Sequence, residues 1–291
     1  MEQYITKFEA LIICFLLSSF FVGSLYFFDR KKQLKLSRDH PEVIKKRIIS
    51  ISIVCVVSPL FLVLYYYFRN VFEANSFDFF LKTMGITYHN TIIGIGIGLL
   101  LVLLIYIGPM VVMYIQEEMP FQNNNYKSIT FSIYEIRNIV VGPISEEFIF
   151  RSCMISVCYL ANFSNTFMIF VLPLFFGLAH VHHAYEQYSL HKNEENIISR
   201  IIFSIILQFS YTNLFGWFAS FLLLRTDNVL SSIFAHALCN IFNFPDVNSV
   251  LSATGKTRTI YIMFYIIGLI LFIIGMSFVS KTSLIQSLFW K

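Results

Sequence analysis

Long apolar runs separated by short polar stretches dominate the pattern along this chain. Most of the runs hold the roughly 20 residues that one membrane-crossing helix needs. The pattern predicts an all-α fold, a polytopic integral membrane helical bundle of about eight transmembrane helices. The runs are Phe8–Phe28, Ile48–Phe68, Thr91–Ile115, Tyr134–Leu160, Phe167–Ala184, Ile197–Leu224, Val229–Phe244 and Ile260–Val279.

The polar stretches between the runs are short, and the sequence contains no internal repeat and no soluble appendage. We therefore predict one integral membrane domain over residues 1–291, with its distinctive motifs between residues 142 and 245. The sixth run is long and could be broken near Tyr211–Gly216. The first run is too long and too weakly flanked for a cleaved signal peptide, so we interpret it as a signal anchor.

Composition supports the membrane interpretation and excludes a soluble class. Hydrophobic residues make up 57% of the chain and charged residues only 13%, against about 25% charged residues in soluble globular proteins. So few charges could not cover the surface of a protein in water. The cysteines form no CxxC pair and lie in or beside apolar runs, which is typical of small buried hydrophobic side chains.

The net charge of +4 is informative mainly through its placement. Lysine and arginine crowd into the stretch Asp29–Arg47, between the first two runs. Under the positive-inside rule this stretch is cytosolic, so the N-terminus is lumenal and every odd-numbered loop is cytosolic. A short basic loop held between two spans is a poor nucleic-acid site, so we expect no nucleic-acid partner.

Ionisable and amide side chains gather in three clusters inside the predicted spans. Such groups cost about 2.5–3.5 kcal/mol each in a membrane and by default indicate function. The clusters are Glu146, Glu147 and Arg151 in the fourth run, His180 and His183 at the end of the fifth, and His236 and Asn240 in the seventh.

Helical spacing places the members of each cluster on one face. Glu147 and Arg151 are four residues apart, in the order that favours an ion pair. Gly142-Pro143 indicates a helix break or start just before the glutamates, which would put both carboxylates at a positive helix end. The predicted topology then brings all three clusters to a similar depth near the cytosolic side, provided that the sixth run crosses the membrane once.

An acid, two imidazoles and an amide are suited to hydrolysis. A buried Glu146 can take a proton from water, and a histidine beside it can orient that water. A second histidine and an asparagine can donate hydrogen bonds to the oxyanion of a tetrahedral intermediate, at about 2.7–4 kcal/mol per donor. A nucleophilic Cys239 is a less favoured alternative, because buried cysteines are usually inert.

The three clusters resemble the motifs EExxxR, FxxxH and HxxxN of the type II CAAX prenyl proteases. In this sequence they are Glu146-Glu147-x-x-x-Arg151, Phe176-x-x-x-His180 and His236-x-x-x-Asn240. The first motif alone would be weak, but the ordered set of three in a multi-spanning chain is specific. The resemblance covers residues 142–245, and the flanking sequences resemble the eukaryotic branch of the family.

The resemblance implies an enzyme of the endoplasmic reticulum membrane with its active site toward the cytosol. It would remove the last three residues from proteins prenylated at a C-terminal CaaX cysteine, such as Ras-like small GTPases, and would contact membrane lipid. By analogy Glu146 is the general base, His180 its partner on the water, and His236 and Asn240 the oxyanion hole. Glu147 and Arg151 would be mainly architectural.

Two alternatives stay open at this stage. A zinc-dependent protease could use His180, His183, His236 and Glu146 as ligands, but there is no HExxH motif and Asn240 would be a poor ligand, so we expect no cofactor. Without a metal ion, we expect His183 to support the catalytic residues. A non-enzymatic transporter or scaffold could also bury Glu and His residues, but a transporter usually shows repeated halves, and none is found.

Overall fold

The computed structural model describes residues 4–27, 36, 39–74, 76–119, 132–181, 188, 196–281, 283 and 285–290. Within these residues every regular element is a helix, which confirms the all-α prediction. The elements are α1 (Lys7–Ser24), α3 (Pro41–Phe68), α4 (Val71–Ala74), α5 (Phe77–Thr83), α6 (Thr91–Ile105), α7 (Ile107–Ile115), α8 (Ile133–Glu135), η1 (Ile136–Val141), α9 (Gly142–Glu147), η2 (Phe148–Cys153), α10 (Met154–Leu160), α11 (Asn165–Phe170), α12 (Leu174–Ala179), α14 (Ile197–Thr226), α15 (Val229–Phe242), α16 (Val247–Ser252) and α17 (Gly255–Lys281).

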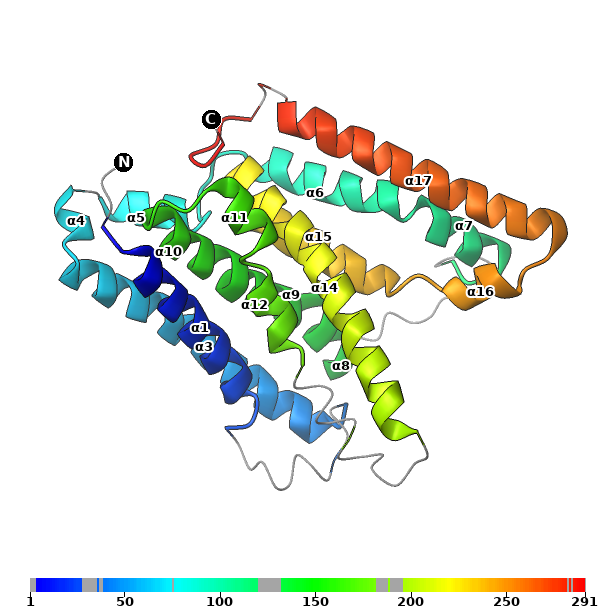
Figure 1. Cartoon of the computed structure of the whole chain (residues 1–291), viewed down its shortest axis with the longest axis horizontal. Coiled ribbons are helices and arrows are strands. Elements are labelled where there is room, and N and C mark those ends of the chain that lie inside the picture. Colours follow the sequence, from blue (N-terminus) through cyan, green and yellow to red (C-terminus); the bar gives the residue numbers. More distant parts are fainter. Residues whose placement is uncertain are drawn as a thin grey trace.

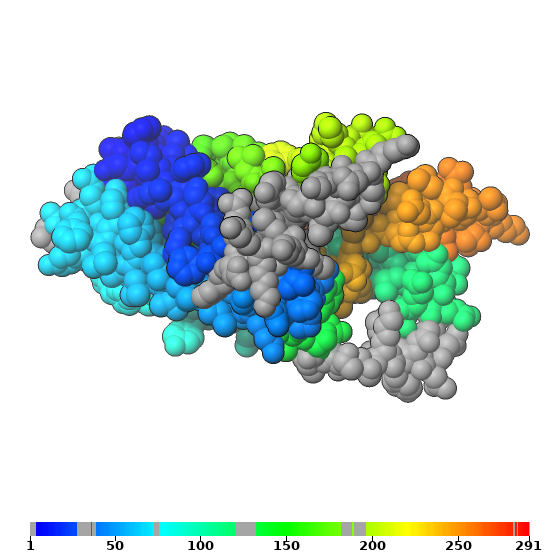
Figure 2. Space-filling model, turned by 90° about the horizontal axis from the view of Figure 1, so that it is seen from below, coloured from blue at the N-terminus to red at the C-terminus, as the bar shows by residue number. Residues whose placement is uncertain are grey.

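The helices pack in a row rather than around a single axis. α3 contacts α1, α1 contacts α10 and α12, α12 contacts α14, and α14 contacts α15, which lies against α6 and then α17 (Figure 1). Seen from below, α1 and α3 lie at one side of the molecule and α17 at the other (Figure 2). The helices that carry the three polar clusters are therefore in the middle of the row.

The outer helices expose apolar side chains, as a lipid-facing surface would. On α17, for example, Ile266, Ile270 and Ile273 are about half exposed. Four described helices are long and apolar enough to cross a membrane, α1, α3, α14 and α17, and the bent pair α6 and α7 makes a fifth if it is one span. The chain is thus an integral membrane protein, while the number of eight crossings stays a prediction.

Two proline residues break runs that we had expected to be single helices. Proline lacks the backbone N–H, and its ring collides with the carbonyl four residues earlier. Pro109 accordingly follows the 56° bend between α6 and α7 at Tyr106. Pro173 stands at the turn between α11 and α12, so the predicted fifth span is a pair of short helices.

The basic stretch was expected to be a loop as far as Arg47, and that boundary was wrong. α3 begins at Pro41, with proline at its first position and the side chain of His40 accepting the backbone N–H of Glu42. Lys45, Lys46 and Arg47 therefore lie in the first turns of α3. The sixth run, by contrast, is one unbroken helix, α14, as the convergence of the clusters requires.

The bundle has two ends, the Pro41 end and the Lys7 end. At the Pro41 end, α1 finishes and α3 begins. Arg137 in η1 also lies there and contacts Asp39. At the Lys7 end, Lys7 lies over the ring of Phe163, and α10 is followed by α11.

At the Lys7 end, the C-terminal residues fold back onto the bundle. The buried guanidinium of Arg225 donates from Nε to the Val279 carbonyl and from Nη1 to the Ile285 carbonyl, both at 2.8 Å. Asn165 Nδ2 donates to the Phe289 carbonyl at 2.7 Å. The buried guanidinium of Arg225 therefore holds the C-terminal residues against the bundle.

Candidate active site

The first cluster lies in the interior of one long helix, not at a helix start. Residues 133–160 are helical without interruption, through α8, η1, α9, η2 and α10. The break expected at Gly142-Pro143 is absent, since η1 is a π-helical turn that widens the backbone just before the proline ring. Glu146 and Glu147 consequently gain nothing from a helix end and need charged partners within the bundle.

Glu147 and Arg151 form the predicted intrahelical ion pair. Arg151 Nη1 lies 3.3 Å from Glu147 Oε1, and the two side chains are 1% and 0% exposed. A buried charge without a partner is very costly, so each side chain stabilises the charged form of the other.

Glu147 has a second partner, which the sequence analysis did not foresee. His236 on α15 places Nδ1 2.8 Å from Glu147 Oε1, so this carboxylate joins the first and third clusters. An ionised carboxylate only accepts hydrogen bonds, so His236 donates through Nδ1–H. Glu147 thereby sets the ring orientation of His236 as well as pairing with Arg151.

The second ring nitrogen of His236, Nε2, is directed toward Glu146. His236 Nε2 lies 3.9 Å from Glu146 Oε2, too far for a direct hydrogen bond. The Glu146 side chain is 22% exposed, against 0% for Glu147. Glu146 therefore combines a neighbouring imidazole with access to solvent.

The second cluster joins the site through an aromatic ring. The Arg151 guanidinium stands over the ring of Phe176 on α12, 4.2 Å from its centroid, which is a favourable cation–π geometry. Phe176 in turn contacts the ring of His180, with centroids 4.5 Å apart. The phenylalanine of the FxxxH motif thus packs against the arginine of the EExxxR motif.

His180 is held by its own helix. Its Nδ1 lies 2.8 Å from the Phe176 carbonyl oxygen. Because a carbonyl can only accept, Nδ1 carries the proton, and in the neutral ring Nε2 is the acceptor. A neutral His180 therefore has the tautomer that can accept a hydrogen bond from water.

Asn240 lies one turn beyond His236 on α15. Its Nδ2 donates to the main-chain carbonyl of Asn138 in η1, at 2.7 Å. This bond uses one of the two N–H donors of the amide. Sequence reasoning could not identify Asn138, because it contributes a main-chain oxygen and no side-chain signal marks it. Phe215 on α14 was also missed, although its ring centroid lies 4.6 Å from that of His236.

The structure thus links Glu146, Glu147, Arg151, Phe176, His180 and His236 through consecutive contacts. His183, the supporting residue of the sequence analysis, lies outside the described residues. Cys239 contacts the hydroxyl of Tyr106. In the described part of the chain, no three His, Cys, Asp or Glu residues are grouped so that they could hold a metal ion.

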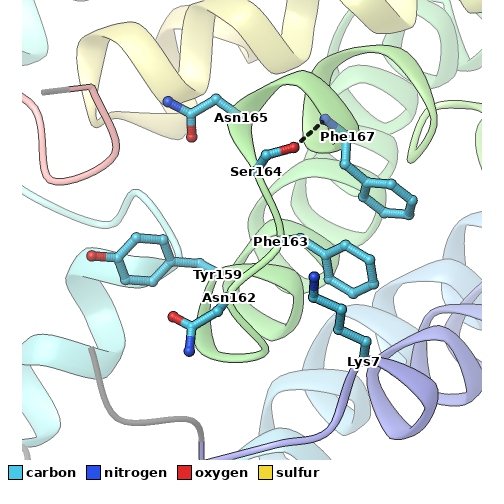
Figure 3. Close-up of a pocket in the computed structure, with 7 residues that line it drawn as sticks. All are labelled: Lys7, Tyr159, Asn162, Phe163, Ser164, Asn165 and Phe167. Atoms are coloured by element: carbon cyan, nitrogen blue, oxygen red, sulfur yellow. Dashed lines mark hydrogen bonds between the residues drawn. The ribbon is translucent and has the colours of Figure 1, made fainter.

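The cavity drawn in Figure 3 lies away from these motifs. It has a volume of about 460 Å³ at the Lys7 end, where α1, the end of α10 and the start of α11 meet. Its lining residues are Lys7, Tyr159, Asn162, Phe163, Ser164, Asn165 and Phe167. Tyr159 lies 13 positions beyond Glu146 on the same continuous helix, about 20 Å along its axis. We therefore place the candidate site at the linked motifs and not at this cavity.

Comparison with known proteins identifies the family. The family model described as "Type II CAAX prenyl endopeptidase Rce1-like" matches residues 128–242, which include every motif residue above. The "Probable CAAX prenyl protease 2" of Schizosaccharomyces pombe is 32% identical over 267 residues, covering 90% of this chain and 90% of that protein. The chain belongs to the type II CAAX prenyl endopeptidases.

Other relatives of this endopeptidase agree. The "CAAX prenyl protease 2" of Homo sapiens is 30% identical over 82% of this chain and 71% of its own length. That of Arabidopsis thaliana is 42% identical over 120 residues, 41% of this chain and 36% of its own length. No solved structure matches. The chain is therefore a membrane-embedded CAAX prenyl endopeptidase, which is a hydrolase. This excludes the transporter and scaffold alternatives.

Proposed function

We propose that this endopeptidase removes the C-terminal tripeptide from prenylated CaaX proteins, such as Ras-like small GTPases, at the cytosolic side of the endoplasmic reticulum membrane. Family membership supports the substrate class. The basic residues Lys45, Lys46 and Arg47 at the Pro41 end support a cytosolic position for that end, under the positive-inside rule. The prenyl chain would lie in lipid beside the bundle.

Glu146 is the general base in this proposal. It takes a proton from a water molecule, and the water oxygen bonds to the carbonyl carbon of the prenylated cysteine. When the tetrahedral intermediate collapses, the C–N bond breaks and Glu146 returns the proton to the leaving amine of the tripeptide. The observation that carries this role is the position of His236 between two carboxylates of different exposure, one enclosed and one reached by solvent.

The remaining residues act on the water and the oxyanion. His180, through Nε2, orients the attacking water. His236 Nε2 and the second N–H of Asn240 donate to the oxyanion. Because the Nδ1–H of His236 donates to Glu147, donation from Nε2 as well requires the imidazolium form, whose charge Glu146 and Glu147 balance. Glu147 is a positioning residue in this scheme.

The proposed reaction needs no metal, because carboxylate and imidazole supply both the base and the oxyanion donors. A zinc ion held by His180, His183, His236 and Glu146 is the alternative mechanism. A glutamate mechanism requires activity that survives a strong chelator.

The products test the proposed reaction directly. We would incubate the purified protein in detergent with a farnesylated CaaX peptide in H₂¹⁸O and analyse the products by mass spectrometry. We expect an intact aaX tripeptide and one ¹⁸O atom on the new carboxylate of the farnesylcysteine. The same peptide without the farnesyl group is the control and should be cleaved far more slowly. Cleavage at another bond, or equal cleavage of both peptides, would contradict the proposal.

A further inference from the structure

A CaaX substrate has a charged group that the proposed mechanism leaves without a partner. This step rests on the proposed function: the scissile bond follows the prenylated cysteine, so a free carboxylate lies three residues beyond it. A carboxylate is expensive near a membrane interior unless a cation is close. A cation about one tripeptide away from the base would stabilise this carboxylate.

The long helix that carries Glu146 offers two arginines. Arg151 is 1% exposed and already paired with Glu147, so a substrate cannot reach it. Arg137 lies nine positions before Glu146, toward the Pro41 end, and its side chain is 15% exposed. At the usual helical rise, nine residues cover roughly 13 Å, and three extended residues span about 10 Å. These two lengths are similar, so a substrate carboxylate three residues beyond the scissile bond would lie near the level of Arg137 along the helix.

The guanidinium of Arg137 is held in a fixed position. Its Nε donates to Asn138 Oδ1 at 2.9 Å, and its Cζ lies over the Tyr134 ring, 4.6 Å from the centroid. The main-chain carbonyl of the same Asn138 binds Asn240. Arg137 is thus connected to the wall of the candidate active site through a single residue.

In this structure the guanidinium of Arg137 already binds a carboxylate. Asp39, just before α3, places Oδ1 2.9 Å from Arg137 Nη1, and its side chain is 49% exposed. Because half of the Asp39 side chain is exposed, water and salt compete for its carboxylate and weaken the pair. A substrate carboxylate in place of Asp39 would keep an anion beside the Arg137 guanidinium.

We propose that Arg137 binds the C-terminal carboxylate of the substrate, in the place that Asp39 takes in this structure. Arg137 is then a specificity-determining residue, since it distinguishes a free C-terminus from a chain that continues or is capped. Asp39 competes with the substrate. The two members of one ion pair therefore have opposite effects on substrate binding.

Two farnesylated peptides that differ only at the C-terminus, free acid and carboxamide, test the proposal. We expect the wild-type protein to prefer the acid in kcat/KM by about 10-fold. Arg137→Gln should bring the acid-to-amide ratio close to one, mainly through a higher KM for the acid, and Arg137→Lys should keep part of it. Asp39→Asn should lower the KM for the acid two- to threefold. Lys45→Gln, which removes an exposed charge at the same end, should leave the ratio unchanged.

The outcomes separate this inference from the proposed function. If Arg137→Gln weakens cleavage of both peptides equally, or if Asp39→Asn raises the KM as Arg137→Gln does, the pair is structural and the inference is overturned. If Arg137→Gln does not fold, the ratios for Arg137→Lys and Asp39→Asn decide in the same way. Cleavage of neither peptide by folded wild-type protein would overturn the proposed function and this inference together.

Discussion

Glu146 and Glu147 are neighbours in the sequence but occupy different environments. Glu147 is enclosed and contacts both Arg151 and His236, whereas Glu146 is 22% exposed and faces His236 at 3.9 Å. The spacing in the sequence was sufficient to predict the Glu147–Arg151 pair. It could not reveal that Glu147 also orients His236, because that contact joins residues 89 positions apart.

The difference in environment predicts different costs for the same substitution. Glu147→Gln leaves the Arg151 charge buried without its carboxylate and should lower the free energy of unfolding by about 3–5 kcal/mol. Glu146→Gln should change stability little, because its side chain reaches solvent. Thermal unfolding of both purified variants in one detergent is the measurement. Equal midpoints would show that the two carboxylates are not divided between structure and chemistry.

A third carboxylate, which lies outside the spans, is also informative. Asp227 follows α14 at the Lys7 end, with φ +60°, and its side chain is largely buried. Burial raises the pKa of this carboxyl from 3.8 to about 6, although His89 and Lys82 act in the opposite direction. A raised pKa means that the folded state holds the proton more tightly. The contribution to stability is complete below pH 3.8 and is lost as the pH rises through about 6.

Asp227→Asn should remove that dependence. Asparagine tolerates a positive φ and resembles the protonated carboxyl. We expect the variant to unfold at a higher temperature than the wild type at pH 7.5, with the difference shrinking as the pH falls to 5. Thermal unfolding midpoints of both proteins across this range check the sign. A constant difference at every pH would contradict the raised pKa.

Buried ionisable groups in a membrane chain do not all indicate catalysis. Arg225 is as buried as Arg151, yet it binds main-chain carbonyls of the C-terminal residues. What distinguished the catalytic candidates in the sequence was their order and spacing on three separate helices. Burial alone would have pointed equally to Arg225.

At the scale of single helices, the apolar runs located the elements well but not their ends or bends. The runs are defined by side-chain polarity, whereas bends depend on backbone groups. Pro109 and Pro173 lie where helices inside apolar runs are interrupted. The helix continues through Pro143, which follows a π-helical turn, and α3 continues through Pro59. α3 begins earlier than its apolar run because charged residues form its first turns.

α15 carries His236 and Asn240, and its position depends on close packing against α6. A Cβ atom at Gly98 would lie 2.6 Å from the Ser231 carbonyl oxygen, too close for any adjustment of a side chain. Small residues at such interfaces let two membrane helices approach. Gly96 on the same helix has nothing within 4 Å of its added Cβ.

This contrast supplies a matched pair of variants. Gly98→Ala should push α6 away from α15 and destabilise the protein by about 1–3 kcal/mol, with loss of peptidase activity as α15 moves. Gly96→Ala should leave both unchanged or slightly improve stability, since alanine favours helix. Unfolding midpoints and cleavage rates, measured side by side, check the prediction. A Gly98→Ala protein as stable and active as Gly96→Ala would argue against tight packing here.

At the scale of the whole molecule, the sequence indicated that the three motifs converge, and the fold brings them together in the middle of the helix row. This required α14 to be a single helix, as it is. The depth of the site in the membrane and its cytosolic orientation follow from the positive-inside rule and stay predictions. The same holds for the number of crossings, because the short helices α11, α12 and α15 cannot be counted by length alone.

The measurement that tests the central claim most directly is cleavage of a farnesylated CaaX peptide by the purified protein and by Glu146→Gln, with and without a metal chelator. We predict that the wild-type rate is unaffected by chelator and that Glu146→Gln is slower by about 10²–10⁴-fold while it remains folded. A rate that is lost to chelator and restored by zinc, or a Glu146→Gln protein as fast as the wild type, would contradict the glutamate mechanism.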